Sequence, residues 1–188
     1  AQQLAGGRVG FKVDRAADIR QVLSFAKRTG IKAVIIGGSE AWKEAQALKT
    51  AATPVLLDGL SNLPGSFDEL GATLENAARL HRAGVRIAFT QSGDATHNAR
   101  KVRQGAGNAV AHGLPWEAAL AALTRSPAEI FGLGSSLGRI APGYSADLVL
   151  WSGDPLEVTS VAQAMWIDGK PQSMRSRQTE LRDRYRPR

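Results

Sequence analysis

Short apolar runs alternate with longer segments of helical periodicity through the first half of the chain. The runs cover residues 9–13, 32–38, 53–59 and 85–90. Several are apolar at successive positions, which is typical of strands buried on both faces of a parallel sheet. The order strand–helix, repeated four times, predicts an α/β fold with right-handed crossovers.

The segments between the runs carry helix start and stop signals. Gly30 follows a segment with apolar residues at helical spacing and is expected to end that helix. Ser39 is expected to cap a helix over 40–49. Further helices are expected from about Asp68 to Ala83 and from about Asn98 to His112.

The second half of the chain changes character. Two helical segments come first, and Ser126 and Glu129 have the spacing of a capping box at the start of the second one. Apolar runs at 139–141, 146–151 and 164–170 then predict strands. Asp168 and Gly169 form a dipeptide that favours a β-hairpin turn.

Four strand–helix units are too few for a closed barrel, which needs eight. In an open sheet both outer strands would present unpaired backbone edges. Three interpretations remain open: the chain is a fragment whose partner half is missing, it dimerises across a sheet edge, or it is a small open α/β fold.

Composition limits the function classes. The 188 residues include no cysteine, so disulfides and thiolate metal sites are excluded. The apolar runs are too short to cross a bilayer. Part of the net charge of +7 lies in residues 176–188, whose one aromatic residue is Tyr185. We read this segment as a solvated basic tail and expect neither a nucleic-acid nor a membrane partner.

Three stretches in the second half resemble the C-terminal half of an amidohydrolase-superfamily protein of the imidazolonepropionase-like group. They read TRSPAEIFGL, LGRIAPGYSADLVLWSGDPL and VAQAMWIDGK, in this order. The resemblance implies half of a (β/α)8 TIM-like barrel with four parallel βα units over residues 1–135. It also implies part of a composite β-sandwich over 136–175, followed by the tail at 176–188. Asp147 is expected to be a structural carboxylate in that sandwich.

The resemblance further implies metal-dependent hydrolysis. The family's ligands in this half would be a histidine after the fifth strand, a histidine after the sixth and an aspartate after the eighth. This sequence departs from the pattern at all three places, so we expect no metal site in this half. Zinc or another divalent metal would belong to the full-length protein. The residues at the three places are Lys12 to Asp14, Gly37 with Gly38, and Gln91 with Ser92.

The candidate site residues lie where the strands of this half end. Asp94 and His97 are candidates for an acid–base pair or for two metal ligands, because His97 is the one histidine in a loop on the active face. His81 and His112 are expected to be structural or exposed at helix ends. The expected substrate pocket consists of Lys12, Ser39, Asp58 and Gln91.

Two functions are consistent with these residues. The first is a hydrolase of carbon–nitrogen bonds other than peptide bonds, such as those of cyclic amides, with a small-molecule substrate. The second is a catalytically degenerate relative that binds a ligand or serves as a partner subunit. Either would be completed by the missing N-terminal half or by a second subunit. The sequence leaves a cytoplasmic and a periplasmic location open.

Overall fold

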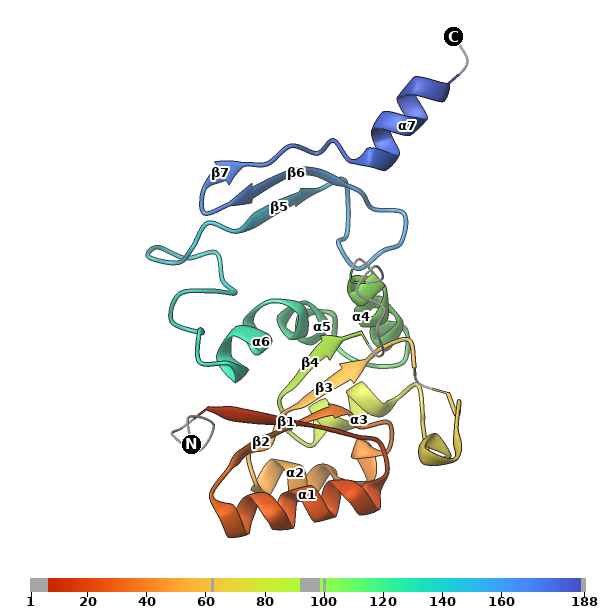
Figure 1. The fold of residues 1–188 in the computed structure, drawn as a ribbon, viewed down its shortest axis with the longest axis vertical. Coiled ribbons are helices and arrows are strands. Elements are labelled where there is room, and N and C mark those ends of the chain that lie inside the picture. The colour runs from red at the N-terminus through yellow and green to blue at the C-terminus, as the bar shows by residue number, and fades with distance from the viewer. Residues whose placement is uncertain (1–6, 62, 92–98, 100, 187–188) are drawn as a thin grey trace. The chain divides into compact units, whose positions relative to one another are not determined.

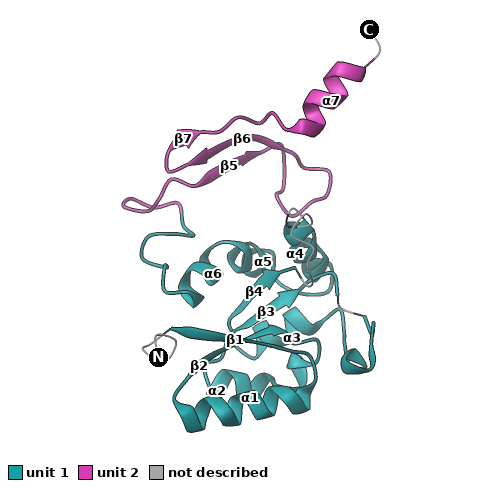
Figure 2. Cartoon of the chain, in the orientation of Figure 1, with its two compact units in different colours: residues 1–139 teal, residues 140–188 magenta. Residues whose placement is uncertain are grey.

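A computed structural model describes residues 7–61, 63–91, 99 and 101–186. The chain divides into two compact units, residues 1–139 and residues 140–188, which Figure 2 colours separately. Each unit has its own sheet.

The first unit contains a four-stranded parallel sheet whose spatial order follows the sequence. Its strands are β1 (Arg8–Val13), β2 (Lys32–Gly37), β3 (Val55–Asp58) and β4 (Ile87–Thr90). The connecting helices are α1 (Ala16–Thr29), α2 (Ala45–Thr50) and α3 (Asn76–Arg82). Sequential order with crossovers of one hand puts the connecting helices on one face, as in a barrel wall. Figure 1 shows α1 and α2 together on one side of the sheet.

The outer face of the sheet packs against the connecting helices. The ring of Phe11 in β1 meets that of Phe25 in α1 edge-on, at 6.2 Å between centroids. Residues in register with Phe11 on the neighbouring strands share this face, and they include the fully buried Ile35 and Val55. Burial of these aliphatic side chains is the main stabilisation of the unit.

The inner face is only partly covered. Val34, Ala88 and Ile130 form a buried cluster there, with Leu56 packed against it. Ile130 belongs to α6 (Arg125–Ile130), which follows α4 (Val102–Ala111) and α5 (Trp116–Leu123). On β1, in contrast, Lys12 on this face is exposed. The inner wall is therefore apolar near its centre and open along β1.

The backbone of β3 approaches α4 closely at its carboxyl end. Gly59 lies against Gly105, and a Cβ atom on Gly59 would come within 2.7 Å of the Cα of Gly105. The amide of Asn108 donates to the carbonyl oxygen of Gly59 at 2.9 Å. Glycine is therefore needed at position 59, and a Cβ atom on Gly105 would also be close, at 3.2 Å from the Cα of Gly59.

Three expected helix starts are wrong. The hydroxyl of Ser39 does not cap a helix, because it donates to Asp14; a 3-10 turn, η2 (Ala41–Glu44), precedes α2 instead. The helix expected from Asp68 is limited to the 3-10 turn η3 (Phe67–Glu69) and, after a loop, α3. Helix α6 begins at Arg125, so Ser126 lies inside it and makes no cap.

The second unit is a three-stranded antiparallel sheet with the order β5–β6–β7. Its strands are β5 (Leu148–Trp151), β6 (Ala162–Ile167) and β7 (Lys170–Pro171), and residues 139–141 do not form a strand. The predicted hairpin turn is confirmed: φ is +51° at Asp168 and +73° at Gly169, as a type I′ turn requires. Asp147 accepts a 2.8 Å hydrogen bond from the Asp168 amide, which is the structural role expected for it.

The basic tail forms a helix, α7 (Arg177–Tyr185), that begins with a capping box between Ser176 and Thr179. It has no buried residue, which fits a solvated segment. None of the helices in the described part of the chain is long and apolar enough to cross a membrane.

Candidate functional site at the carboxyl ends of the strands

Polar side chains on the inner face of the sheet lie toward its carboxyl end. Lys12 is in register with Ile36, and Ile36 with Leu56, so these three side chains share the inner face. Asp58 and Thr90 follow on the same face, one pair further along β3 and β4. In parallel barrels, binding and catalytic residues lie at this end of the strands.

Lys12 and Asp58 do not form an ion pair. Two strand spacings separate β1 from β3, or about 10 Å, and Asp58 lies about 7 Å further along the strands. A small molecule on the inner face could lie between the ammonium group and the carboxylate. Lys12 and Asp58 therefore lie apart from each other on the same inner face of the sheet.

Asp58 is held in a fixed orientation. It is buried, its Oδ1 accepts from the Leu60 amide at 2.9 Å, and its Oδ2 accepts from the Ser61 hydroxyl at 3.3 Å. An Asp side chain that binds the amide two residues on stabilises the turn after the strand.

Gln91 follows β4 directly, at the same end of the sheet. Its Oε1 atom is buried and has no hydrogen-bond partner within the described ranges. Buried polar atoms are usually paired, because an unpaired one costs about 1–3 kcal/mol. Gln91 therefore supplies an acceptor that a donor from a bound molecule could satisfy.

Ser39 has a different environment from the other pocket candidates. It is buried at the carboxyl end of β2, where its amide and its hydroxyl both donate to Oδ1 of Asp14, at 3.1 and 2.8 Å. These bonds join the ends of β1 and β2. The geometry assigns Ser39 to the structure of the turn, and its place in the substrate pocket stays a prediction.

Glu40 connects three segments at the same end of the sheet. Its Oε2 accepts from the amide of Ala16, at the start of α1, and its Oε1 accepts from the Gly71 amide and the Lys43 ammonium group. The pKa of Glu40 is lowered, first by the hydrogen bond from Ala16 and next by that from Lys43, against an opposing effect of burial. Glu40 is therefore a stable anion at neutral pH.

Asn76 completes this arrangement. It is 1% exposed; its side-chain amide donates to the Gly38 carbonyl at 2.9 Å, and its Oδ1 accepts from the Trp42 amide at 3.1 Å. No local pattern in the sequence indicates these roles of Glu40 and Asn76. Their backbone partners lie 24 to 38 residues away in the chain.

The catalytic candidates Asp94 and His97 lie outside the described residues, as does Ser92. Within the described ranges, no group of three or more His, Cys, Asp or Glu side chains could hold a metal ion. Gly37, where the resemblance leads us to expect a ligand, has φ of +93°. The described residues of this half thus do not fit the family's metal site.

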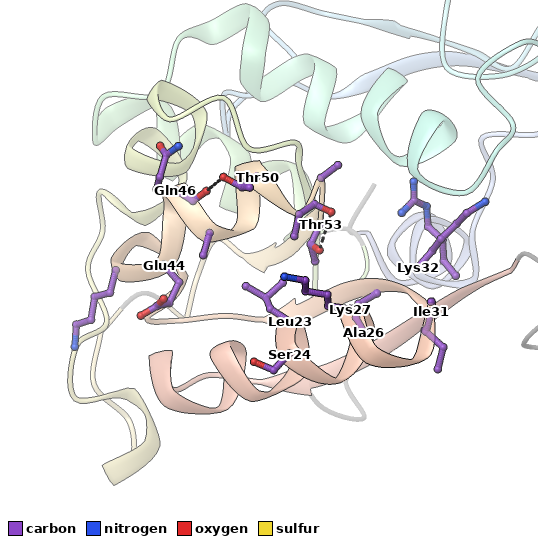
Figure 3. Close-up of a pocket in the computed structure, with 17 residues that line it drawn as sticks. Leu23, Ser24, Ala26, Lys27, Ile31, Lys32, Glu44, Gln46, Thr50 and Thr53 are labelled. Atoms are coloured by element: carbon purple, nitrogen blue, oxygen red, sulfur yellow. Dashed lines mark hydrogen bonds between the residues drawn. The ribbon is translucent and has the colours of Figure 1, made fainter.

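A cavity of about 1120 Å³ opens elsewhere, between α1 and α2 (Figure 3). Its lining includes Lys27, Lys32 and Thr53, near the amino ends of β2 and β3. Lys27 lies in the last turn of α1, where a cation offsets the negative end of the helix dipole. The cavity thus lies on the side of the connecting helices and not on the inner face of the sheet, and the helix dipole accounts for Lys27.

Comparison with known proteins points to one family. The sequence profile of the Amidohydrolase family matches residues 10–174. An imidazolonepropionase from Chromobacterium violaceum is 38% identical over 108 residues, which are 56% of this chain and 25% of that protein. The amidohydrolase tasK of Hapsidospora irregularis is 44% identical over 75 residues, or 40% of this chain and 8% of that protein.

Solved structures agree on the fold. The crystal structure of an amidohydrolase from Thermotoga maritima superposes with a TM-score of 0.82 at 32% identity, over 89% of this chain and 44% of that one. A Xanthomonas campestris adenosine deaminase with bound zinc superposes with a TM-score of 0.65 at 19% identity. This chain therefore spans less than half the length of these proteins, and its four strands correspond to half of a TIM barrel.

Proposed function

Because the chain belongs to the amidohydrolase family, we propose that it is half of a hydrolase that cleaves carbon–nitrogen bonds other than peptide bonds, with a cyclic amide or similar small molecule as substrate. The family match over residues 10–174 supports the reaction class. The observation that carries the proposal is the inner face of the sheet, where Lys12, Asp58 and Thr90 lie at the end that holds the active site in barrel enzymes.

These residues suit a cyclic amide chemically. The ammonium group of Lys12 is a donor for a carbonyl oxygen, and the Asp58 carboxylate is an acceptor for a ring N–H. Asp58 needs no reorganisation to act, because its orientation is already fixed by Leu60 and Ser61. In this proposal Lys12 and Asp58 bind and orient the substrate, and Asp94 and His97 remain candidates for proton transfer.

The other half of the barrel must come from outside this chain. β1 and β4 are the edge strands of the sheet, and their outer edges are unpaired in the described part of the chain. Four further βα units would pair with both edges and cover the inner face. We propose that a longer chain or a second subunit supplies them, together with any divalent metal that the family resemblance implies.

The test is metal analysis and turnover of the full-length protein, purified without chelator. The substrates would be hydantoins, imidazolones and acyl amino acids. We expect near-stoichiometric divalent metal and hydrolysis of at least one substrate, with kcat/KM reduced at least tenfold by Lys12→Met or Asp58→Asn. Absence of both metal and hydrolysis would refute the hydrolase proposal.

A second candidate function is favoured by Gly37 and Lys12, which occupy places where the resemblance leads us to expect histidines. In this function the chain is a catalytically degenerate half-barrel, which binds a ligand without converting it or pairs with an active relative. Calorimetry separates the two: binding of a hydantoin or acyl amino acid with no product after prolonged incubation supports this candidate. Replacing Asp94 and His97 by alanine in an active protein tests that pair, and unchanged turnover would remove it from the chemistry.

A further inference from the structure

We infer that carboxylate hydrogen bonds, and not a metal ion, fasten the carboxyl ends of β1 and β2, and that these two strands contribute no metal ligand to the barrel. The inference deepens the proposed function, on which it rests only for the family's expected ligand positions. It is carried by the geometry of Gly37, Asp14, Ser39 and Glu40.

Gly37 occupies a position that is built for glycine. Its φ of +93° lies in the region that residues with a side chain rarely adopt. A Cβ atom there would be 2.7 Å from Oδ1 of Asp14, closer than ordinary van der Waals contact. A histidine at the end of β2 would therefore need both a strained backbone and a displaced Asp14.

Asp14 occupies the space that such a side chain would enter. Its Oδ1 is 2.7 Å from the Cβ position of Gly37 and accepts two hydrogen bonds from Ser39. Hydrogen bonds to an ionised carboxylate are about twice as strong as neutral ones. An incoming metal would have to displace these donors to use this oxygen as a ligand.

Glu40 extends the fastening to α1 and to the loop before α3. Both of its carboxylate oxygens already accept hydrogen bonds, from Ala16, Gly71 and Lys43. Backbone bonds run alongside, from the Gly38 amide to Val13 at 2.8 Å and from the Glu40 amide to Asp14 at 3.0 Å. Hydrogen bonds between protein groups thus join the ends of the two strands.

Lys12 is the remaining place on β1 where the resemblance leads us to expect a histidine. It is exposed on the inner face. A protonated ammonium group has no lone pair for a metal. The described residues at both strand ends therefore include a cation, two glycines and carboxylates held by hydrogen bonds.

The test compares metal content and thermal stability of the full-length wild type with those of Asp14→Asn and Lys12→Met. We expect the zinc or manganese content to be the same in all three. Asp14→Asn should lower the unfolding midpoint by about 3–6 °C, because two charge-assisted hydrogen bonds become neutral. Asp18→Asn, at an exposed Asp in the first turn of α1, is the matched control and should change it by less than about 2 °C.

A fall in metal content to half or less in Lys12→Met or Asp14→Asn would overturn the inference. Lys12→Met changes an exposed side chain, so its result stands even if Asp14→Asn does not fold. If the purified wild type carries no metal, zinc is added to all three proteins and its uptake is measured. The inference is overturned if the wild type takes up zinc and Lys12→Met or Asp14→Asn does not. It is supported if none of the three proteins takes up zinc. Absence of zinc uptake by all three proteins would count against the metal in the proposed function while supporting this inference, so the two proposals can fail separately.

Discussion

Asn76→Ala removes a side chain whose hydrogen bonds join the end of β2, η2 and α3. The substitution leaves the Gly38 carbonyl and the Trp42 amide without their partner. Asn76 is 1% exposed, so water cannot replace the lost bonds without a rearrangement. Alanine fits a helix start sterically, so backbone strain does not contribute.

The magnitude follows from the two unpaired groups. Each buried unpaired backbone group costs about 1–3 kcal/mol, and alanine recovers about 0.5 kcal/mol through its higher helix propensity. We expect a loss of about 1.5–5.5 kcal/mol in the free energy of unfolding, or about 3–22 °C in Tm for a chain of this size.

Urea unfolding followed by circular dichroism measures the effect, with the m-value as a check that the two end states are unchanged. Glu75→Ala is the control, because Glu75 is adjacent in sequence but exposed, in an ion pair with Arg79. It should cost no more than about 1 kcal/mol. If Asn76→Ala lies within about 0.5 kcal/mol of the wild type, the buried network is not as described.

Three further predictions test other parts of the structure. Gly59→Ala should cost about 1–3 kcal/mol by urea unfolding, because its Cβ would collide with Gly105; equal stability would show that β3 and α4 are further apart. The stability difference between wild type and Glu40→Gln should shrink as pH falls from about 5 to about 3, because a lowered pKa gives stability that is lost on protonation; a difference independent of pH would contradict the role of the charge. Asp147→Ala should remove about 1 kcal/mol and speed amide exchange at Asp168, to which it is bonded; unchanged exchange would exclude that bond.

The sheet could be predicted from the sequence because its strands are locally encoded. The runs at 9–13 and 32–38 correspond to β1 and β2 within a residue at each end. Gly30 ends α1 with φ of +71°, which only glycine adopts readily. The Asp168–Gly169 turn is equally local, because an Asp-Gly dipeptide readily adopts positive φ at both positions.

The candidate site could be predicted only in part, because its contacts join distant segments. Ser39 reads as a helix cap in the sequence, but a carboxylate 25 residues earlier, Asp14, takes its hydroxyl. The helix expected from Asp68 is cut short where the Gly71 amide bonds to Glu40, 31 residues earlier. The local sequence pattern predicts the helix or strand in which a residue lies. It does not show which distant carboxylate will bind that residue's hydroxyl or amide group.

The most direct test of the central claim, that this chain is half of a closed barrel, is an experimental structure of the full-length protein or of its complex with the completing subunit. The account predicts that β1 and β4 each form parallel hydrogen bonds along their outer edges with strands from the other half. It also predicts that Lys12 and Asp58 face one enclosed space. A structure in which both edges remain unpaired, or in which the inner face is covered by helices alone, would contradict it.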